Sequence, residues 1–214
     1  MEKGLTVSFD LDGTLTKHTF VDGVWNEGIP YIVAKKRGIS FEDARSLCME
    51  AYKAEGESSI RWYQLGYWMN FFDIQDIDVN KLVLRFTDRI CVFDDAIPVL
   101  ERLKRDNCTL IIFSNATRPF LDKEVSVSKI APYFDKIISL PDDWGMLKAQ
   151  TQAFVRLRSI VDGEFIHAGD HIYYDYEVPR SVGIDAFHIW RGSGPKRNDS
   201  LTSLEAFTDR VLCG

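Results

Sequence analysis

The sequence has few of the features that mark zinc domains, disulfide-linked secreted domains and membrane proteins. It holds four cysteines in 214 residues, and none of them forms a CxxC pair or a cluster with histidines. This spacing argues against a zinc site or a disulfide framework, and unpaired thiols fit a reducing, cytoplasmic setting. No apolar run approaches the length of about 18 residues that marks a membrane-spanning helix, and residues 1–9 lack the long apolar segment of a signal peptide. We therefore expect a cytoplasmic protein with no membrane partner.

Basic residues are also scarce relative to acidic ones. Lysine and arginine total 26 against 32 aspartates and glutamates, and the net charge is -6. Non-specific binding of nucleic acid needs clustered lysine and arginine, so we expect no nucleic-acid partner. A phosphorylated small substrate stays compatible with this charge, because local groups and a bound cation set the field inside a cleft.

The pattern of apolar residues divides the chain into two kinds of segment. A short apolar run, Leu5–Phe9, predicts a buried strand. Residues 16–92 show only helical patterns, at 26–37, 41–54, 59–72 and 79–90, with Ser40 as a predicted N-cap. Beyond residue 92, apolar strands at 109–113, 136–140, 164–168 and 185–190 alternate with helices at 97–105, 121–130, 147–160, 177–182 and 201–211.

This alternation predicts an α/β fold, a doubly wound parallel sheet covered by helices on both faces. The catalytic core would comprise residues 1–15 and 93–214, and an α-helical cap, residues 16–92, would be inserted after the first strand.

Charged and polar side chains follow the predicted strands at the points where these end. They are Asp10 and Asp12 after the first strand, Ser114 and Asn115 after the second, Lys148 at the start of the helix after the third, and Asp170 and Asp175 after the fourth. Ligands of open parallel sheets bind beyond the carboxyl ends of the strands, so we expect these groups to converge on one cleft.

The chemistry of this set favours phosphoryl transfer. Clustered carboxylates repel one another unless a cation neutralises them, and hard oxygen ligands select Mg²⁺ over zinc or copper. A carboxylate such as Asp10 can attack phosphorus to form an aspartyl-phosphate. A second carboxylate two residues on, Asp12, can protonate the leaving oxygen and then activate water.

Four segments resemble the signatures of the haloacid dehalogenase-like hydrolase superfamily. They are Phe-Asp-Leu-Asp-Gly-Thr-Leu at 9–15, Ile-Phe-Ser-Asn at 112–115, Lys148 followed by Phe154, and His-Ala-Gly-Asp at 167–170 with Asp175 five positions later. The third match departs from the family at Ala149, where proline is common, and the fourth loop carries Val178 and Pro179 in place of the usual small residues. The four signatures occur in order and span nearly the whole chain.

The resemblance implies a role for each matching residue. Asp10 would be nucleophile and magnesium ligand, Asp12 the acid and base with its backbone carbonyl on the metal, and Asp170 the third protein ligand. Asp175 would orient the site from behind these ligands or through water, Ser114 and Asn115 would hold phosphoryl oxygens, and Lys148 would neutralise Asp10 and the phosphate.

The expected function is Mg²⁺-dependent hydrolysis of a small phosphorylated metabolite, a phosphate monoester. A phosphomutase uses the same parts and stays an alternative. Dehalogenation of a 2-haloacid is disfavoured by Asp12, because that reaction has no leaving group that needs this acid. A phosphonatase would need a lysine in the cap that forms a Schiff base, and nothing marks Lys35, Lys36 or Lys53 for that role. A binding module that has lost catalysis is the alternative outside enzymes.

Aromatic residues of the predicted cap allow two interpretations. Trp62, Leu65, Trp68 and Phe72 recur at helical spacing, which favours packing inside the cap. The alternative is a stacking surface for an aromatic or sugar moiety. By the usual layout of the family, Lys17, Phe20 and Trp25 would face the substrate from the hinge, and His18 and His171 lie close to predicted catalytic loops.

Overall fold

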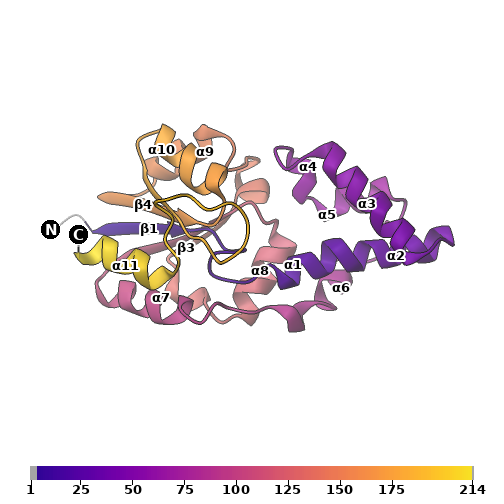
Figure 1. Ribbon diagram of the computed structural model, residues 1–214, viewed down its shortest axis with the longest axis horizontal. Coiled ribbons are helices and arrows are strands. Elements are labelled where there is room, and N and C mark those ends of the chain that lie inside the picture. The colour runs from indigo at the N-terminus through magenta and orange to yellow at the C-terminus, as the bar shows by residue number, and fades with distance from the viewer. Residues whose placement is uncertain (1–3, 214) are drawn as a thin grey trace.

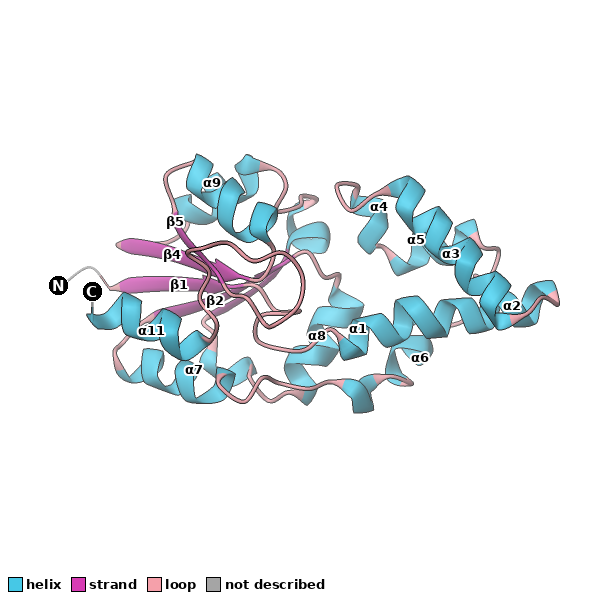
Figure 2. Ribbon diagram, viewed as in Figure 1, coloured by secondary structure: helices cyan, strands magenta, loops and turns pink. Residues whose placement is uncertain are grey.

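A five-stranded parallel sheet forms one lobe of the molecule, and helices alone form the other (Figures 1 and 2). The computed structural model describes residues 4–212 with their side chains and the backbone of Cys213. The strands are β1 (Leu5–Phe9), β2 (Thr109–Ser114), β3 (Lys136–Ser139), β4 (Glu164–Gly169) and β5 (Asp185–His188), in the order β3-β2-β1-β4-β5. All pairs are parallel, and β1 lies at the centre with Phe9 opposite Ile112 on one side and Ala168 on the other. The predicted doubly wound α/β fold is confirmed.

Helices cover both faces of this sheet. One face packs against α7 (Ala96–Arg105), α8 (Arg118–Val127) and α11 (Leu204–Cys213), and the other against α9 (Thr151–Ser159) and α10 (Val178–Ser181). Successive side chains of a strand point to opposite faces, so Ile112 joins the first cluster and Phe113 the second. Burial on both faces explains why the strands read as continuous apolar runs.

The second lobe is built from the chain between β1 and β2. Its elements are α1 (Thr19–Gly23), a π-helical turn (Val24–Gly28), α2 (Ile29–Arg37), α3 (Phe41–Glu55), α4 (Ile60–Tyr63), α5 (Leu65–Phe71), α6 (Val79–Leu84) and a 3₁₀ turn (Thr87–Arg89). They enclose a second hydrophobic cluster, to which the buried Phe20, Trp68 and Phe72 belong and to which α8 contributes Phe120. The chain enters this lobe near Lys17 and leaves it near Cys91. These two segments lie side by side, and the Lys17 amide donates to the Cys91 carbonyl at 2.8 Å.

Several predicted helices have different limits, each for a physical reason. The helix expected at 26–37 begins at Thr19. Gly23 and Gly28 lie inside it where the Phe86 ring packs closely, because an added Cβ would lie 2.6 Å from the ring at Gly23 and 2.8 Å from it at Gly28. The helix expected at 79–90 stops at Leu84, whose carbonyl accepts from the Thr87 hydroxyl. The Ser40 N-cap is confirmed, since its hydroxyl accepts from the Asp43 amide at 3.1 Å.

The helix expected at 59–72 is broken at Gln64, whose backbone is extended. The reason lies in the carbonyls before the break. The Trp62 carbonyl accepts from the Trp68 indole at 3.1 Å, and the Tyr63 carbonyl accepts from the Thr117 hydroxyl at 3.3 Å. Side chains thus take the place of the backbone donors that would have continued the helix.

Smaller shifts affect the sheet lobe. Helix α8 begins three residues earlier than expected with Pro119 in its first turn, and α11 begins at Leu204 because Leu201 still pairs with Ile189. The helix expected at 177–182 is a π-helical segment (Ile172–Glu177) followed by α10, and β5 ends at His188. Within residues 4–213, no helix has both the length and the apolarity to cross a membrane.

Candidate functional site

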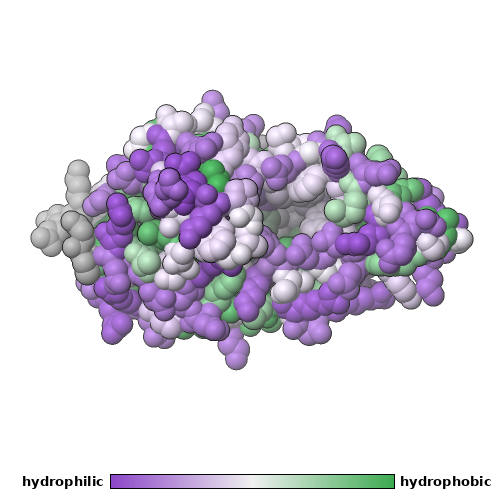
Figure 3. All heavy atoms as spheres, viewed as in Figure 1, coloured by the Kyte–Doolittle hydropathy of each residue, from purple (hydrophilic) through white to green (hydrophobic). Residues whose placement is uncertain are grey.

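The polar residues predicted at strand ends meet at the carboxyl edge of the sheet, between its central strands. Asp10 follows β1, Ser114 ends β2, and Asp170 follows β4. Because β1 connects to β2 on one side and pairs with β4 on the other, this edge is the point where strand order reverses, the usual ligand position in such sheets. A cavity of about 790 Å³ opens here between the two lobes, and Figure 3 shows the hollow on the surface.

Lys148 is the centre of the charge arrangement at the cavity floor. Its ammonium donates to Asp10 Oδ1 at 2.5 Å and to Asp175 Oδ1 at 2.6 Å, and its side chain is 3% exposed. Burial alone would lower the pKa of Lys148, but the two carboxylates outweigh it and raise the pKa above its ordinary value. The ammonium is therefore a fixed positive charge beside Asp10.

A buried histidine supports this lysine through Asp175. His167 Nε2 lies 3.0 Å from Asp175 Oδ1, and its Nδ1 lies 2.7 Å from Ser8 Oγ. Burial lowers the pKa of His167, while Lys148 and His167 outweigh burial and bring the pKa of Asp175 well below its usual range. Asp175 is then an ionised acceptor, so the neutral imidazole donates from Nε2 and accepts from the Ser8 hydroxyl at Nδ1. This chain of contacts fixes Asp175, and Asp175 fixes Lys148.

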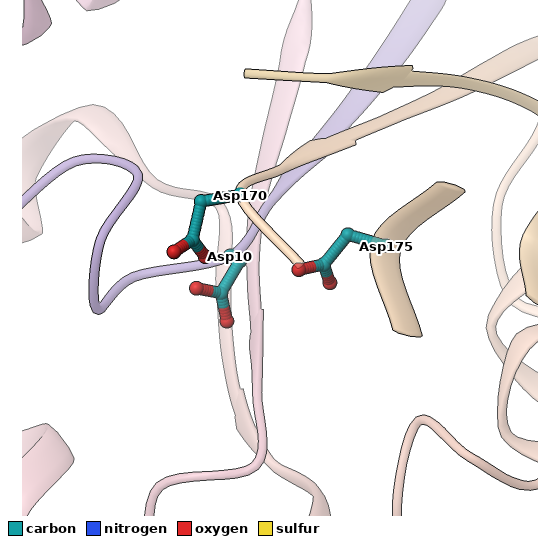
Figure 4. Close-up of side chains that lie close together, drawn as sticks. All are labelled: Asp10, Asp170 and Asp175. Carbon is teal, nitrogen blue, oxygen red and sulfur yellow. The ribbon is translucent and has the colours of Figure 1, made fainter. Parts of the chain in front are cut away.

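Three carboxyl groups face one another around this point. One oxygen from each of Asp10, Asp170 and Asp175 lies within 4.8 Å of the others (Figure 4). Burial raises the pKa of Asp10 well above its ordinary value, Lys148 opposes the shift, and the neighbouring carboxylates add to it. An all-oxygen set with excess negative charge suits a hard divalent cation such as Mg²⁺. Asp10 and Asp170, two of the predicted ligands, lie in this cluster together with Asp175, which was expected to orient the site from behind them.

Two glycines make room for this cluster. Gly13 has φ +81° and an added Cβ there would lie 2.2 Å from Asp170 Oδ2. At Gly169 the added Cβ would lie 2.3 Å from Asp175 Cγ. A side chain at either position would displace a carboxylate, so both positions require glycine for close approach rather than for flexibility alone.

Asp12 lines the cavity beside the cluster, and its carboxyl group lies against helix α8. Its Oδ1 is buried without a hydrogen-bond partner among the described residues, and its carboxyl group faces that of Glu124. Burial raises the pKa of both groups, that of Glu124 to about 7. Glu124 is not among the predicted site residues, although its spacing from Phe120 and Leu121 places it on the apolar face of α8. On the other side of the site, His18 Nε2 lies 3.3 Å from Asp170 Oδ2, and this hydrogen bond raises the pKa of His18 to about 9.

Asn115 connects three parts of the site. Its Oδ1 accepts from the Lys148 amide at 2.9 Å, and its Nδ2 donates to the Tyr63 hydroxyl at 3.2 Å. Lys148 lies in a turn three residues before α9, so the prediction that it stands at the start of a helix is wrong. The contact with Asn115 holds this turn in place. The neighbouring Ser114 accepts from the Ala116 amide at 3.0 Å, and the residue that precedes α8 as N-cap is Thr117.

The half of the cavity that faces the helical lobe is lined by aromatic side chains. They are Trp25, Tyr52, Trp62 and Tyr63 from the helical lobe and Phe120, His171 and Tyr174 from the sheet lobe. Trp68 and Phe72 are buried in the helical lobe as expected, whereas Trp62 of the same predicted stripe lines the cavity. Phe20 is 0% exposed, so the expectation that it faces a substrate is wrong.

Comparison with known families agrees with the sequence signatures. The family model of haloacid dehalogenase-like hydrolases matches residues 5–183. The chain belongs to this family. Among curated proteins, it is similar to the GMP/IMP nucleotidase YrfG of Escherichia coli, with 25% identity over 134 residues. The match covers 63% of this chain and spans about three fifths, 59%, of that relative.

Solved structures support the fold. A HAD phosphatase from Thermococcus onnurineus superposes with a TM-score of 0.85 at 24% identity, covering 100% of this chain and 99% of that one. The putative HAD-hydrolase YfnB from Bacillus subtilis, solved with bound magnesium, gives a TM-score of 0.70 at 13% identity with complete coverage, 100%, of both chains. These similarities extend over the sheet and the helical lobe together.

Proposed function

We propose that this hydrolase is a Mg²⁺-dependent phosphatase that cleaves small phosphate monoesters through an aspartyl-phosphate on Asp10. The observation that carries the proposal is the Lys148 ammonium held between Asp10 and Asp175 at the floor of the cavity, with Asp170 alongside. In this proposal residues 1–15 and 93–214 form the catalytic core, and residues 16–92 form the cap. The free thiols of Cys48, Cys91 and Cys108 support a cytoplasmic setting.

The chemistry divides into two steps at Asp10. A carboxylate oxygen of Asp10 forms a bond to phosphorus while the ester P–O bond breaks, and the leaving oxygen takes a proton from Asp12. Water then attacks the phosphorus of the aspartyl-phosphate and gives its proton to Asp12. The bond between phosphorus and the Asp10 oxygen breaks, which releases inorganic phosphate and restores the Asp10 carboxylate. Lys148 balances the negative charge of the phosphoryl group in both steps, and the Asn115 and Ser114 side chains hold its oxygens.

The carboxylates of Asp10 and Asp170 and the backbone carbonyl of Asp12 would hold Mg²⁺. Asp175 would lie behind these ligands and orient the site by accepting a hydrogen bond from Lys148. The ion would supply positive charge to the phosphoryl oxygens and offset the repulsion among the carboxylates. Lys148 brings one positive charge to the three carboxyl groups of Asp10, Asp170 and Asp175, so a further cation is expected here.

The comparisons support this reaction class. The curated relative is named a nucleotidase for GMP and IMP, which are phosphate monoesters, and the Thermococcus structure is described as a phosphatase. L-2-haloacid dehalogenases also share the fold, one with a TM-score of 0.62 at 19% identity. Asp12 favours the phosphatase, because an ester oxygen needs a proton when it leaves and a halide does not. Of the three cap lysines considered for a phosphonatase, Lys53 borders the cavity but is exposed at its rim.

The test combines turnover with detection of the intermediate. We expect hydrolysis of p-nitrophenyl phosphate with Mg²⁺, its loss in excess EDTA, and its loss in Asp10→Asn. Asp12→Asn should lower turnover by about 10²–10⁴-fold, the usual contribution of general acid–base catalysis. It should also accumulate a phosphate adduct on Asp10, seen by mass spectrometry after acid quenching. Asp162→Asn, at an exposed carboxylate away from the cavity, is the matched control. Full activity in EDTA, or an adduct on another residue, would contradict the proposal.

A further inference from the structure

The aromatic half of the cavity is separate from the charged floor and is built by three helical segments. Trp25 lies on the π-helical turn Val24–Gly28, Tyr52 on α3 and Trp62 on α4. Their rings form a continuous row, with Trp25 and Tyr52 centroids 5.7 Å apart and Tyr52 and Trp62 centroids 6.2 Å apart, both edge to face. The two tryptophans are only partly buried. Trp25 stacks on Phe120 with one face, so the ring surface that Trp25 and Trp62 leave toward the cavity is available to a ligand whose phosphate lies at Lys148.

The charges on the wall beyond the floor restrict what that ligand carries. The carboxylates of Asp22, Glu50 and Glu57 border this half of the cavity, against a single lysine, Lys53. A second phosphate or a carboxylate on the substrate would be repelled, and like charges that are desolvated together are costly. The organic part of the substrate is therefore uncharged or positive.

Hydrogen-bonding groups at the rim distinguish these two cases. Asn26 offers both a donor and an acceptor, Glu50 an acceptor and Lys53 donors, all from the helical lobe. The edge of a nucleobase presents donors and acceptors together, whereas a quaternary ammonium presents neither. Glu57 lies 3.7 Å from His171 Nε2, so one of the three carboxylates already has a basic side chain beside it.

We infer that the row of Trp25, Tyr52 and Trp62 is a nucleobase site, and that the substrates are nucleoside monophosphates. The inference rests on the proposed phosphatase activity and adds the moiety that the cap recognises. The cavity, about 790 Å³, lies within the range of about 300–1,000 Å³ typical of small-ligand pockets. Stacking of a base on an aromatic side chain is sequence-tolerant, so the row sets the class of substrate and the rim sets the preferred base.

Substrate comparison tests the inference directly. We expect kcat/KM for GMP or IMP to exceed that for ribose 5-phosphate, which lacks the base, by about 5–150-fold, the factor that stacking of one base provides. GDP should be a poorer substrate than GMP by at least about tenfold, because its second phosphate meets the acidic wall. Equal kcat/KM for GMP and ribose 5-phosphate, or a preference for phosphocholine, would overturn the inference. Absence of turnover with every phosphate ester would instead overturn the proposed phosphatase.

Variants assign the effect to the aromatic row. Trp62→Ala should lower kcat/KM for GMP about tenfold more than for acetyl phosphate, a compact substrate. Tyr31→Ala is the matched control, since Tyr31 is an exposed aromatic residue of the same lobe, 51% exposed and outside this cavity. Binding is measured without turnover in Asp10→Asn, where GMP should quench tryptophan fluorescence and ribose 5-phosphate should not. Equal losses for both substrates in Trp62→Ala, or quenching by ribose 5-phosphate, would contradict the assignment.

Discussion

Replacing Lys148 by methionine should destabilise the protein strongly, because it leaves two buried carboxylates without their cation. Methionine keeps an unbranched side chain of similar length and removes the charge. The side chains of Lys148, Asp10 and Asp175 are 3%, 10% and 2% exposed, so solvent screens little of their interaction. Breaking a buried ion pair from one side costs about 3–5 kcal/mol. We expect the free energy of unfolding to fall by that amount in the absence of divalent ions.

The assay is urea denaturation in EDTA, with the midpoint and the slope fitted for each variant. For a chain of this length a loss of that size lowers Tm by roughly 6–20 °C. Lys36→Met is the matched control, because Lys36 is 40% exposed and pairs with Asp73 and Asp76 at 3.8 and 3.4 Å on the surface. Exposed pairs contribute about 0–1 kcal/mol. If Lys148→Met lost no more stability than Lys36→Met, the description of Lys148 as a buried counter-charge would be wrong.

Three further predictions concern single positions. Gly13→Ala should reduce turnover at least about tenfold with the fold retained by circular dichroism, because its Cβ would collide with Asp170; unchanged kcat would contradict the close contact. Ser40→Ala should cost about 1 kcal/mol in urea denaturation, the usual worth of an N-cap, and a loss near zero would argue against the cap. Cys91 should react with iodoacetamide before Cys48, which is buried and whose pKa burial raises to about 11; peptide mass spectrometry gives the order.

The sheet and the strand-end residues could be predicted because both follow from local sequence. Runs such as residues 110–113 are apolar on both faces, and only a strand covered on both sides accommodates them. Once the strands are parallel, their carboxyl ends share one edge, and Asp10, Ser114 and Asp170 all lie along it. Their convergence on one cleft also needs these strands to be neighbours, and the observed order supplies this because β2 and β4 both pair with β1.

The limits of helices and the inner wall of the cavity could not be predicted in the same way. Helical spacing assigns Trp62 and Trp68 to one stripe, yet the break at Gln64 rotates Trp62 out of that stripe. The break depends on donors from Thr117 and Trp68, contacts that no window of sequence contains. Likewise, the turn that holds Lys148 depends on Asn115 Oδ1, thirty-three residues earlier in the chain.

Charge balance at the cavity floor connects these tertiary contacts to the need for a cation. Asp10, Asp170 and Asp175 face one another, and among the described residues Lys148 is the one lysine or arginine within hydrogen-bond range of them. In Lys148→Met, a bound cation would take over the charge that the ammonium supplies to the Asp10 and Asp175 carboxylates. A ligand that binds only the folded state stabilises it by an amount that rises with its concentration above Kd. Mg²⁺ should therefore raise the urea midpoint of Lys148→Met more than that of the unsubstituted protein. An equal rise in both would mean that the cation and the ammonium do not act on the same carboxylates.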